Sequence, residues 1–158
     1  APSNYAIEWQ LAKAYAQANR SKDAEIAYRT TIQLKPDFIP AYTSLADLYE
    51  SQKDLNKAIA VYGLAANYTQ KNAEALFRLG RLFFNRSGPG DFARAESVWQ
   101  QAVSIQPNFS NAYYSLGLLY EKQGNRAAAL EQYRKVLALN PDNKDIKLKI
   151  KLLGGGQS

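Results

Sequence analysis

The chain has 158 residues, of which 46% are hydrophobic and 22% charged, a composition typical of a soluble globular protein and not of a disordered one. It contains no cysteine and no histidine, which excludes disulfides, thiolate zinc sites and catalysis by a thiolate or an imidazole. The net charge is +6, but basic residues are interleaved with acidic ones, which favours a solvated surface over a specific nucleic-acid site. No stretch is apolar over the length that a membrane helix needs, so we expect no membrane insertion by this segment. Composition leaves the compartment open between the cytoplasm and, in a bacterium, the periplasm.

The chain repeats one pattern with a spacing of 34 residues, lengthened to 37 inside the third unit. Each unit carries a leucine, a small residue directly after it, an aromatic residue about one turn later, then an alanine and a second aromatic residue. The members of these columns are Leu11, Leu45, Leu79 and Leu116; Ala12, Ala46, Gly80 and Gly117; Tyr15, Tyr49, Phe83 and Tyr120; Ala24, Ala58, Ala95 and Ala129; and Tyr28, Tyr62, Trp99 and Tyr133. A period of this length indicates stacked structural units.

Each unit is expected to form two helices joined by a turn, over residues 5–38, 39–72, 73–109 and 110–143. In the fourth unit apolar residues from Tyr113 to Tyr120 recur at helical spacing, and Gly124 then breaks the pattern as a glycine beyond a helix end does. A second helical stretch follows and ends before Pro141. The small residue after each leucine is expected to let the two helices approach closely. One hairpin has too little interior to be stable alone, so its faces must pack on its neighbours.

The three additional residues of the third unit fall in NRSGPGD, residues 85–91, which predicts a lengthened turn between its two helices. A contact loop is the alternative, because insertions in repeats lie in loops. The glycines in SGPGD are not followed by Lys-Ser or Lys-Thr, so this is not a phosphate-binding loop.

The segment DNKDIKLKIKLL after Pro141 has two interpretations. Apolar residues alternating with lysines have the two-residue period of a strand. In the repeat frame, however, Ile146, Ile150 and Leu153 lie on one helical face toward the preceding hairpin, which favours a capping helix over residues 143–153. Residues 1–153 are then one domain, and residues 154–158 a flexible tail.

The columns resemble those of the tetratricopeptide repeat, and the resemblance extends over roughly residues 5–141. The fourth unit matches nearly throughout, with Val136 where the family prefers alanine; Glu8, Thr31 and Gln70 are further departures. The resemblance implies an all-α fold, a right-handed superhelical solenoid of four hairpins plus the cap. It also implies a protein-interaction scaffold. Because the sequence lacks the usual catalytic signatures and a full set of metal ligands, we expect no enzyme activity, no cofactor and no metal.

In that family the first helices line a concave groove, and the resemblance carries this role to positions that lie outside the packing columns. The candidate binding residues are Trp9, Lys13, Gln17, Thr43, Asp47, Glu50, Phe77, Arg81, Phe84, Asn85, Tyr114, Leu118, Glu121, Lys122, Leu148 and Leu152. Their aromatic and leucine content favours an interface, and packing under neighbouring helices is the alternative. Asp47 and Glu50 are expected to be solvated or paired with Lys13, Arg81 or Lys122.

The expected partner is a protein or peptide segment with apolar anchors and mixed charge. Chaperone C-terminal tails are disfavoured: of the family's clamp positions, which here hold Trp9, Lys13, Asp47, Phe77 and Arg81, only Arg81 agrees. Self-association through the groove is the alternative function, and binding of single-stranded nucleic acid is a weaker one because acidic residues interrupt the groove.

Overall fold

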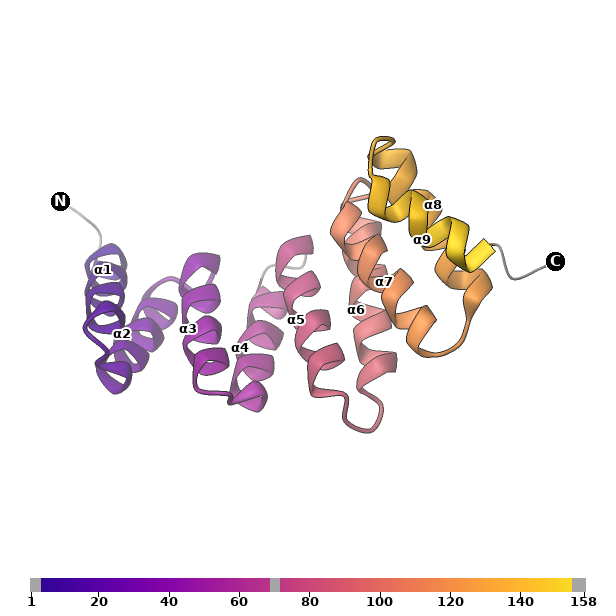
Figure 1. The fold of residues 1–158 in the computed structure, drawn as a ribbon. Coiled ribbons are helices and arrows are strands. Elements are labelled where there is room, and N and C mark those ends of the chain that lie inside the picture. Colours follow the sequence, from indigo (N-terminus) through magenta and orange to yellow (C-terminus); the bar gives the residue numbers. More distant parts are fainter. Residues whose placement is uncertain (1–3, 69–71, 155–158) are drawn as a thin grey trace.

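The computed structural model describes residues 4–68 and 72–154, and within them the chain is entirely helical, with no strand. The predicted all-α repeat solenoid is confirmed: Figure 1 shows helical hairpins set side by side in a row from the N-terminal to the C-terminal end. The helices are α1 (Asn4–Gln17), α2 (Ser21–Leu34), α3 (Ile39–Ser51), α4 (Leu55–Tyr68), α5 (Ala73–Arg86), α6 (Asp91–Ile105), α7 (Ser110–Lys122), α8 (Arg126–Leu139) and α9 (Lys144–Gly154).

Among the described helices, the main contacts run between near neighbours in the row. α1 packs on α2, α3 on α4, α5 on α6 and α7 on α8, and the second helix of each hairpin also packs on the first helix of the next. α9 packs on α8, and the first helices α1 and α3 touch, as do α5 and α7. The core is therefore continuous along the stack, and no hairpin encloses a core of its own.

The close approach of the two helices in a hairpin depends on the small residue after each leucine, as predicted. Gly80 lies against the ring of Trp99 and Gly117 against the ring of Tyr133, so closely that a methyl group at either glycine would overlap the ring. The Trp99 indole also donates a hydrogen bond of 3.0 Å to the Phe77 carbonyl one turn before Gly80. The aromatic residue of the second helix thus fills the space that the small residue leaves.

The first helix of every hairpin ends in the same backbone conformation. The equivalent residues Asn19, Lys53, Ser87 and Gly124 all have positive φ, between 52° and 74°. The sequence indicated this left-handed cap only at Gly124, because glycine alone is the usual signal for it. The other three units therefore adopt the cap without the residue that adopts it most readily.

The junctions between hairpins contain a matched pair of positions. The Tyr49 hydroxyl on α3 donates a 2.7 Å hydrogen bond to Glu25 on α2 and accepts one from Arg29 at 2.9 Å. The bond from Tyr49 is the main reason that the pKa of Glu25 is lowered. The third junction repeats the arrangement: Tyr120 on α7 donates to Glu96 on α6 at 2.7 Å.

At the middle junction both positions are apolar. Phe83 replaces the tyrosine and Ile59 replaces the glutamate, and both pack against the same core cluster. The two positions therefore change polarity together: a tyrosine hydroxyl is paired with a glutamate carboxylate, and a phenylalanine ring is paired with an isoleucine side chain.

The lengthened turn of the third unit lies between α5 and α6, as predicted, and is built around the buried carboxylate of Asp91. Arg86 holds this carboxylate with two hydrogen bonds of 2.7 and 2.8 Å, Arg94 adds one of 3.0 Å, and the Gly88 backbone N–H adds one of 2.9 Å. These donors, Arg86 foremost, hold the pKa of Asp91 far below its usual range. Arg86 also donates to Asn56 at the start of α4 and so joins the turn to the preceding hairpin.

The C-terminal segment is a helix, so the capping-helix interpretation is confirmed and the strand alternative is wrong. Ile146 is buried against α8, and Ile150 and Leu153 pack on the same cluster, as the repeat frame predicts. The Asn143 side chain caps the helix by accepting a hydrogen bond from the Ile146 N–H at 3.0 Å. Gly154, expected in the tail, is the last residue of α9, and residues 155–158 lie outside the described residues.

Two glycines inside helices make a matched pair of tests. Gly117→Ala should lower the free energy of unfolding by about 1–3 kcal/mol, because the added methyl group overpacks the Tyr133 ring. Gly63→Ala in α4 meets no atom within 4 Å and should raise stability by about 0.5–1 kcal/mol through helix propensity. Urea unfolding followed by circular dichroism measures both, and equal effects of the two changes would contradict the close approach.

Asp91→Asn should lower the free energy of unfolding by roughly 1–3 kcal/mol, because Arg86 and Arg94 lose their charged acceptor. Asp142→Asn is the control: this aspartate is exposed before α9, and its change should stay within about 0.5 kcal/mol. The same urea titration compares them. An Asp91 variant as stable as the control would mean that the carboxylate does not hold the turn.

Candidate interaction site

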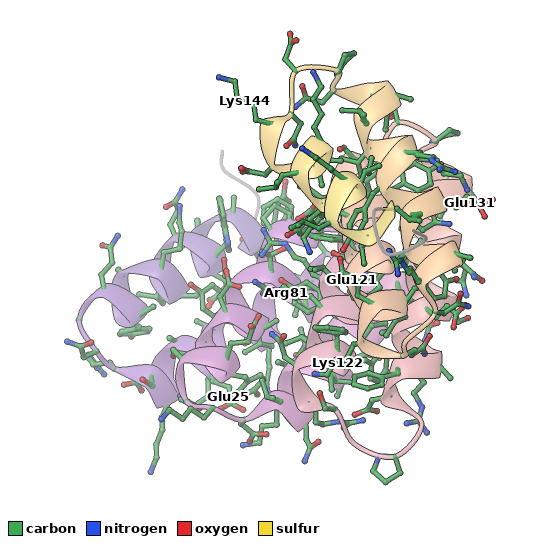
Figure 2. The ribbon with its side chains drawn as sticks, turned by 45° about the vertical axis from the view of Figure 1, so that its right-hand side comes forward. Glu25, Arg81, Glu121, Lys122, Glu131 and Lys144 are labelled. Carbon is green, nitrogen blue, oxygen red and sulfur yellow. The ribbon has the colours of Figure 1, made fainter. Side chains whose placement is uncertain are left out.

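The candidate binding residues come from the first helix of each hairpin and from α9. Figure 2 shows Arg81, Glu121 and Lys122 toward the middle of the view, whereas Glu131 and Lys144 lie toward its edges. Most of the charged residues in the predicted set contact a residue of a neighbouring hairpin or of α9. The geometry therefore separates the predicted set into residues used in packing or pairing and a smaller exposed group.

The acidic residues of α3 pair with arginines of α5. Glu50 accepts two hydrogen bonds from Arg81, at 2.9 and 3.1 Å, which is one of the pairings predicted for it. Asp47 lies 3.6 Å from Arg78, a partner that the sequence did not single out. These carboxylates thus join the second hairpin to the third, and Arg81 is already engaged within the array.

Trp9 and Phe77 occupy equivalent positions and pack in the same way. Each ring lies 5.1 Å from the ring of a phenylalanine that precedes the first helix of the next hairpin, Phe38 for Trp9 and Phe109 for Phe77. The Lys13 ammonium covers the Trp9 ring at 3.8 Å from its centroid. Neighbouring segments therefore partly cover both rings. This agrees with the alternative interpretation, in which these residues pack under neighbouring helices.

Phe84 corrects the expectation that the candidate residues lie outside the contacts within a hairpin. Its ring packs on Phe92 and Trp99 of α6, at centroid distances of 5.7 and 5.8 Å. The Lys122 ammonium of the next hairpin lies 5.0 Å from the Phe84 centroid. Phe84 was placed in the groove by the spacing of α5 alone, which does not tell how far the ring reaches toward α6.

Tyr114 has the position of Trp9 and Phe77 but not their cover. The residue equivalent to Phe38 and Phe109 is Asn143, which is used to cap α9. The Tyr114 ring lies 5.9 Å from Tyr133 on one side, is 37% exposed, and borders an open depression of about 250 Å³. Ser110, Asn111, Asn143 and Asp145 supply polar groups to that depression.

α9 has exposed leucines at the positions equivalent to Tyr114 and Leu118. Leu148 and Leu152, one helical turn apart, are 56% and 70% exposed. Leu118 follows Tyr114 by one turn on α7 and is half-buried. We call Tyr114, Leu118, Leu148 and Leu152 the C-terminal strip. A second depression, of about 330 Å³, borders Leu152, Glu121 and Arg126 at the other end of α9.

An ion pair holds the two helices of the strip together. Lys149 on α9 donates to both Glu121 oxygens on α7, at 2.8 and 3.2 Å. Burial of the Glu121 carboxylate would raise its pKa, but the hydrogen bond from Lys149, the nearby Tyr133 hydroxyl and the Lys149 charge outweigh burial, so the pKa is lowered. Lys149 was not among the predicted residues, because only its place in the cap helix brings it to Glu121.

The remaining candidates contribute less to a surface. The Thr43 hydroxyl is half-buried and donates to the Ile39 carbonyl at 3.2 Å. Gln17 and Asn85 are exposed near the ends of α1 and α5. Among the described residues no group of three or more acidic side chains is placed to hold a metal ion, and no helix has the length and apolarity to cross a bilayer.

Comparison with known proteins supports the repeat assignment. Family models described as tetratricopeptide repeat match residues 39–72 and 110–143, and a model described as TPR repeat matches residues 90–124. The chain belongs to the tetratricopeptide repeat family. An array of this family is, in general terms, a protein-interaction scaffold.

Individual relatives cover the array but extend far beyond it. The chain is 28% identical over 145 residues to the protein O-mannosyl-transferase TMTC3 of Mus musculus, matching 92% of this chain and 13% of that protein. It is 28% identical over 139 residues to the general transcriptional corepressor trfA of Dictyostelium discoideum, 86% of this chain and 10% of the relative. A crystal structure of the MamA protein superposes with a TM-score of 0.79 at 23% identity, covering 96% of this chain and 81% of MamA, which supports the fold alone.

Acid should weaken the hold of α9 on the array. Because the pKa of Glu121 is depressed in the folded state, its pair with Lys149 stabilises the fold above the ordinary carboxyl value of 4.5 and is lost as the pH falls through the folded pKa. At neutral pH, Glu121→Gln should therefore lower the free energy of unfolding by roughly 1 kcal/mol.

Urea unfolding of both proteins over a range of pH measures this difference. The stabilities should converge in acid, and Glu131→Gln, an exposed pair on α8, should show little difference at any pH. A gap between wild type and Glu121→Gln that persists at low pH would contradict the assignment.

Proposed function

We propose that the C-terminal strip binds a segment of a partner protein, with apolar side chains of that segment packing on Tyr114, Leu148 and Leu152. The observation that carries the proposal is the open depression beside Tyr114. In the first and third hairpins the equivalent ring is covered by a phenylalanine of the same chain. In the fourth hairpin an aromatic or aliphatic side chain of a partner takes that place.

The leucines of α9 supply the additional apolar area. A leucine that becomes fully buried contributes about 1.5–3 kcal/mol before the cost of ordering the partner. Two or three such anchors therefore supply a large part of the roughly 8 kcal/mol that a micromolar complex requires. Exposed apolar groups on neighbouring helices of a folded domain are a usual sign of an interface. The segment docks as a helix or as an extended chain in the groove.

The charged residues on this surface limit which partner segments fit it. Glu50 and Arg81 pair with each other, and so do Glu121 and Lys149, so neither Arg81 nor Lys149 is free to bind a terminal carboxylate. Lys144, Lys147 and Lys151 are exposed on α9 and form no ion pair with another described residue. A segment with apolar anchors and acidic residues beside them fits this surface, and a chaperone C-terminal tail does not.

The proposal assigns the array no catalytic step. The relative named as an O-mannosyl-transferase matches the chain over only 13% of its own length, so its name does not transfer an activity. The general role of a scaffold and the residues of the strip are sufficient for the proposed function.

Selection from a displayed peptide library tests the strip without knowledge of the natural partner. Peptides that bind the wild-type chain should carry aromatic or leucine anchors and acidic neighbours. Leu148→Ser with Leu152→Ser should weaken their binding at least tenfold, and Tyr114→Thr, which introduces the residue found at position 43, should weaken it also. Isothermal calorimetry measures the affinities, and circular dichroism checks that the fold is kept.

The control replaces two other leucines that are at least half exposed. Leu34 and Leu64 lie on the second helices α2 and α4 and are 50% and 51% exposed. Their replacement by serine should leave the affinity unchanged. Selected peptides that bind the strip variants and the wild type equally would place the binding surface elsewhere.

A further inference from the structure

The outer side of α1 is apolar and exposed. Ile7 is 51% exposed and Leu11 40%, one turn apart on the side that faces away from the rest of the row. Tyr15 follows after another turn and is half-buried, beside a depression of about 200 Å³ that Leu11 also lines. We call Ile7, Leu11 and Tyr15 the N-terminal face.

The same positions in the other hairpins are covered. The residues equivalent to Ile7 are Ala41, Ala75 and Ala112, and those equivalent to Leu11 are Leu45, Leu79 and Leu116. All six are buried. In each case α2, α4 or α6, the second helix of the preceding hairpin, packs on the helix that carries them. The N-terminal face is therefore a fourth copy of the junction surface, with larger apolar side chains at the first position and with no described helix upon it.

The third position of the face indicates which helix fits. At the junctions above, a tyrosine in this column donates to a glutamate of the preceding second helix, and a phenylalanine is matched by an isoleucine. Tyr15 has the hydroxyl, but no hydrogen bond joins that hydroxyl to another described residue. By the same matching, the helix that packs on α1 carries a glutamate opposite Tyr15, with an arginine or glutamine one turn later.

The C-terminal end of the array, at α9, is charged where the N-terminal face is apolar. α9 presents exposed Lys147 and Lys151 at the positions equivalent to Tyr113 and Gly117, where a second helix packs in the fourth hairpin. Burying these ammonium groups against Ile7 and Leu11 would remove them from water without a partner. The two ends therefore do not suit one another, which disfavours end-to-end stacking of two copies.

We propose that the N-terminal face is a docking surface for one further tetratricopeptide hairpin, stacked ahead of α1 in the same array, whose second helix pairs a glutamate with Tyr15. The occupant repeats the junction that α2 makes with α3. It covers Ile7 and Leu11 with aliphatic side chains and gives the Tyr15 hydroxyl the acceptor that Tyr49 and Tyr120 have.

The chain itself supplies the probe. A second copy of residues 4–37, inserted directly before Asn4, keeps the 34-residue spacing and places the copied Glu25 and Arg29 opposite Tyr15. The extended protein should unfold at a higher temperature than the original chain, and the amides of the added hairpin should be protected from hydrogen exchange.

A double-mutant cycle then tests the pairing itself. In the extended protein, Glu25→Ala in the added copy should lower the equilibrium constant for stacking of the added hairpin about tenfold when Tyr15 is present, and much less after Tyr15→Phe. In the original chain, Tyr15→Phe should leave the unfolding midpoint unchanged. Gln33→Ala in the added copy, at an exposed position of α2, is the control.

Three results would overturn the proposal. An added hairpin whose amides exchange as in an unfolded peptide shows that the face does not accept this helix. Independent effects of the Glu25 and Tyr15 changes show that the pairing is absent. A stable dimer of the original chain in sedimentation analysis, dissociated by Leu11→Asp, assigns the face to a second copy; we expect a monomer.

Discussion

The architecture depends on one constraint: a hairpin of two amphipathic helices cannot bury all its apolar sides by itself, so each must be covered by the next. Within a hairpin, a small residue such as Gly117 brings one helix against the ring of Tyr133 on the other. Between hairpins, the second helix of one packs on the first helix of the next. Both contacts recur with the repeat, and every other feature of the molecule is arranged around them.

Stacking also decides where the molecule is left open. An interior hairpin has neighbours on both sides, whereas the first has a neighbour on one side only, and the fourth is closed by a single helix that carries lysines. Exposed apolar groups accordingly remain on α1 and on α7 with α9, in addition to those that lie along the second helices. Between them, ion pairs such as Glu50–Arg81 join hairpins across the surface where the resemblance places a groove.

The repeat explains how much could be predicted from the sequence. The hairpins, the turn near Asp91 and the side of α9 that carries Ile146 follow from residue spacing, because each depends on contacts at fixed offsets in the repeat frame. Residue spacing does not predict whether a groove position is covered or open, because this depends on a residue about 30 places later that belongs to the next segment of the array. Trp9 meets Phe38, whereas Tyr114 meets a depression because Asn143 occupies that place. Spacing on one helix holds no information about this difference.

Ion-pair partners were predictable only in part for a related reason. Arg81 was recognised as a partner of Glu50 because both lie in the same frame on first helices. Lys149 was not recognised as a partner of Glu121, although the bond is short, because the course of the cap helix relative to α7 was unknown. Long side chains reach across the junctions, and their pairing depends on helix placement to within an ångström or two.

Native-state hydrogen exchange, measured for each backbone amide, tests most directly whether the hairpins are held by their neighbours. Graded protection is expected, with slow exchange in α3 to α6, which have hairpins on both sides, and faster exchange in α1, α2 and α9. A single opening free energy shared by all protected amides, with α1 as slow as α3, would contradict it.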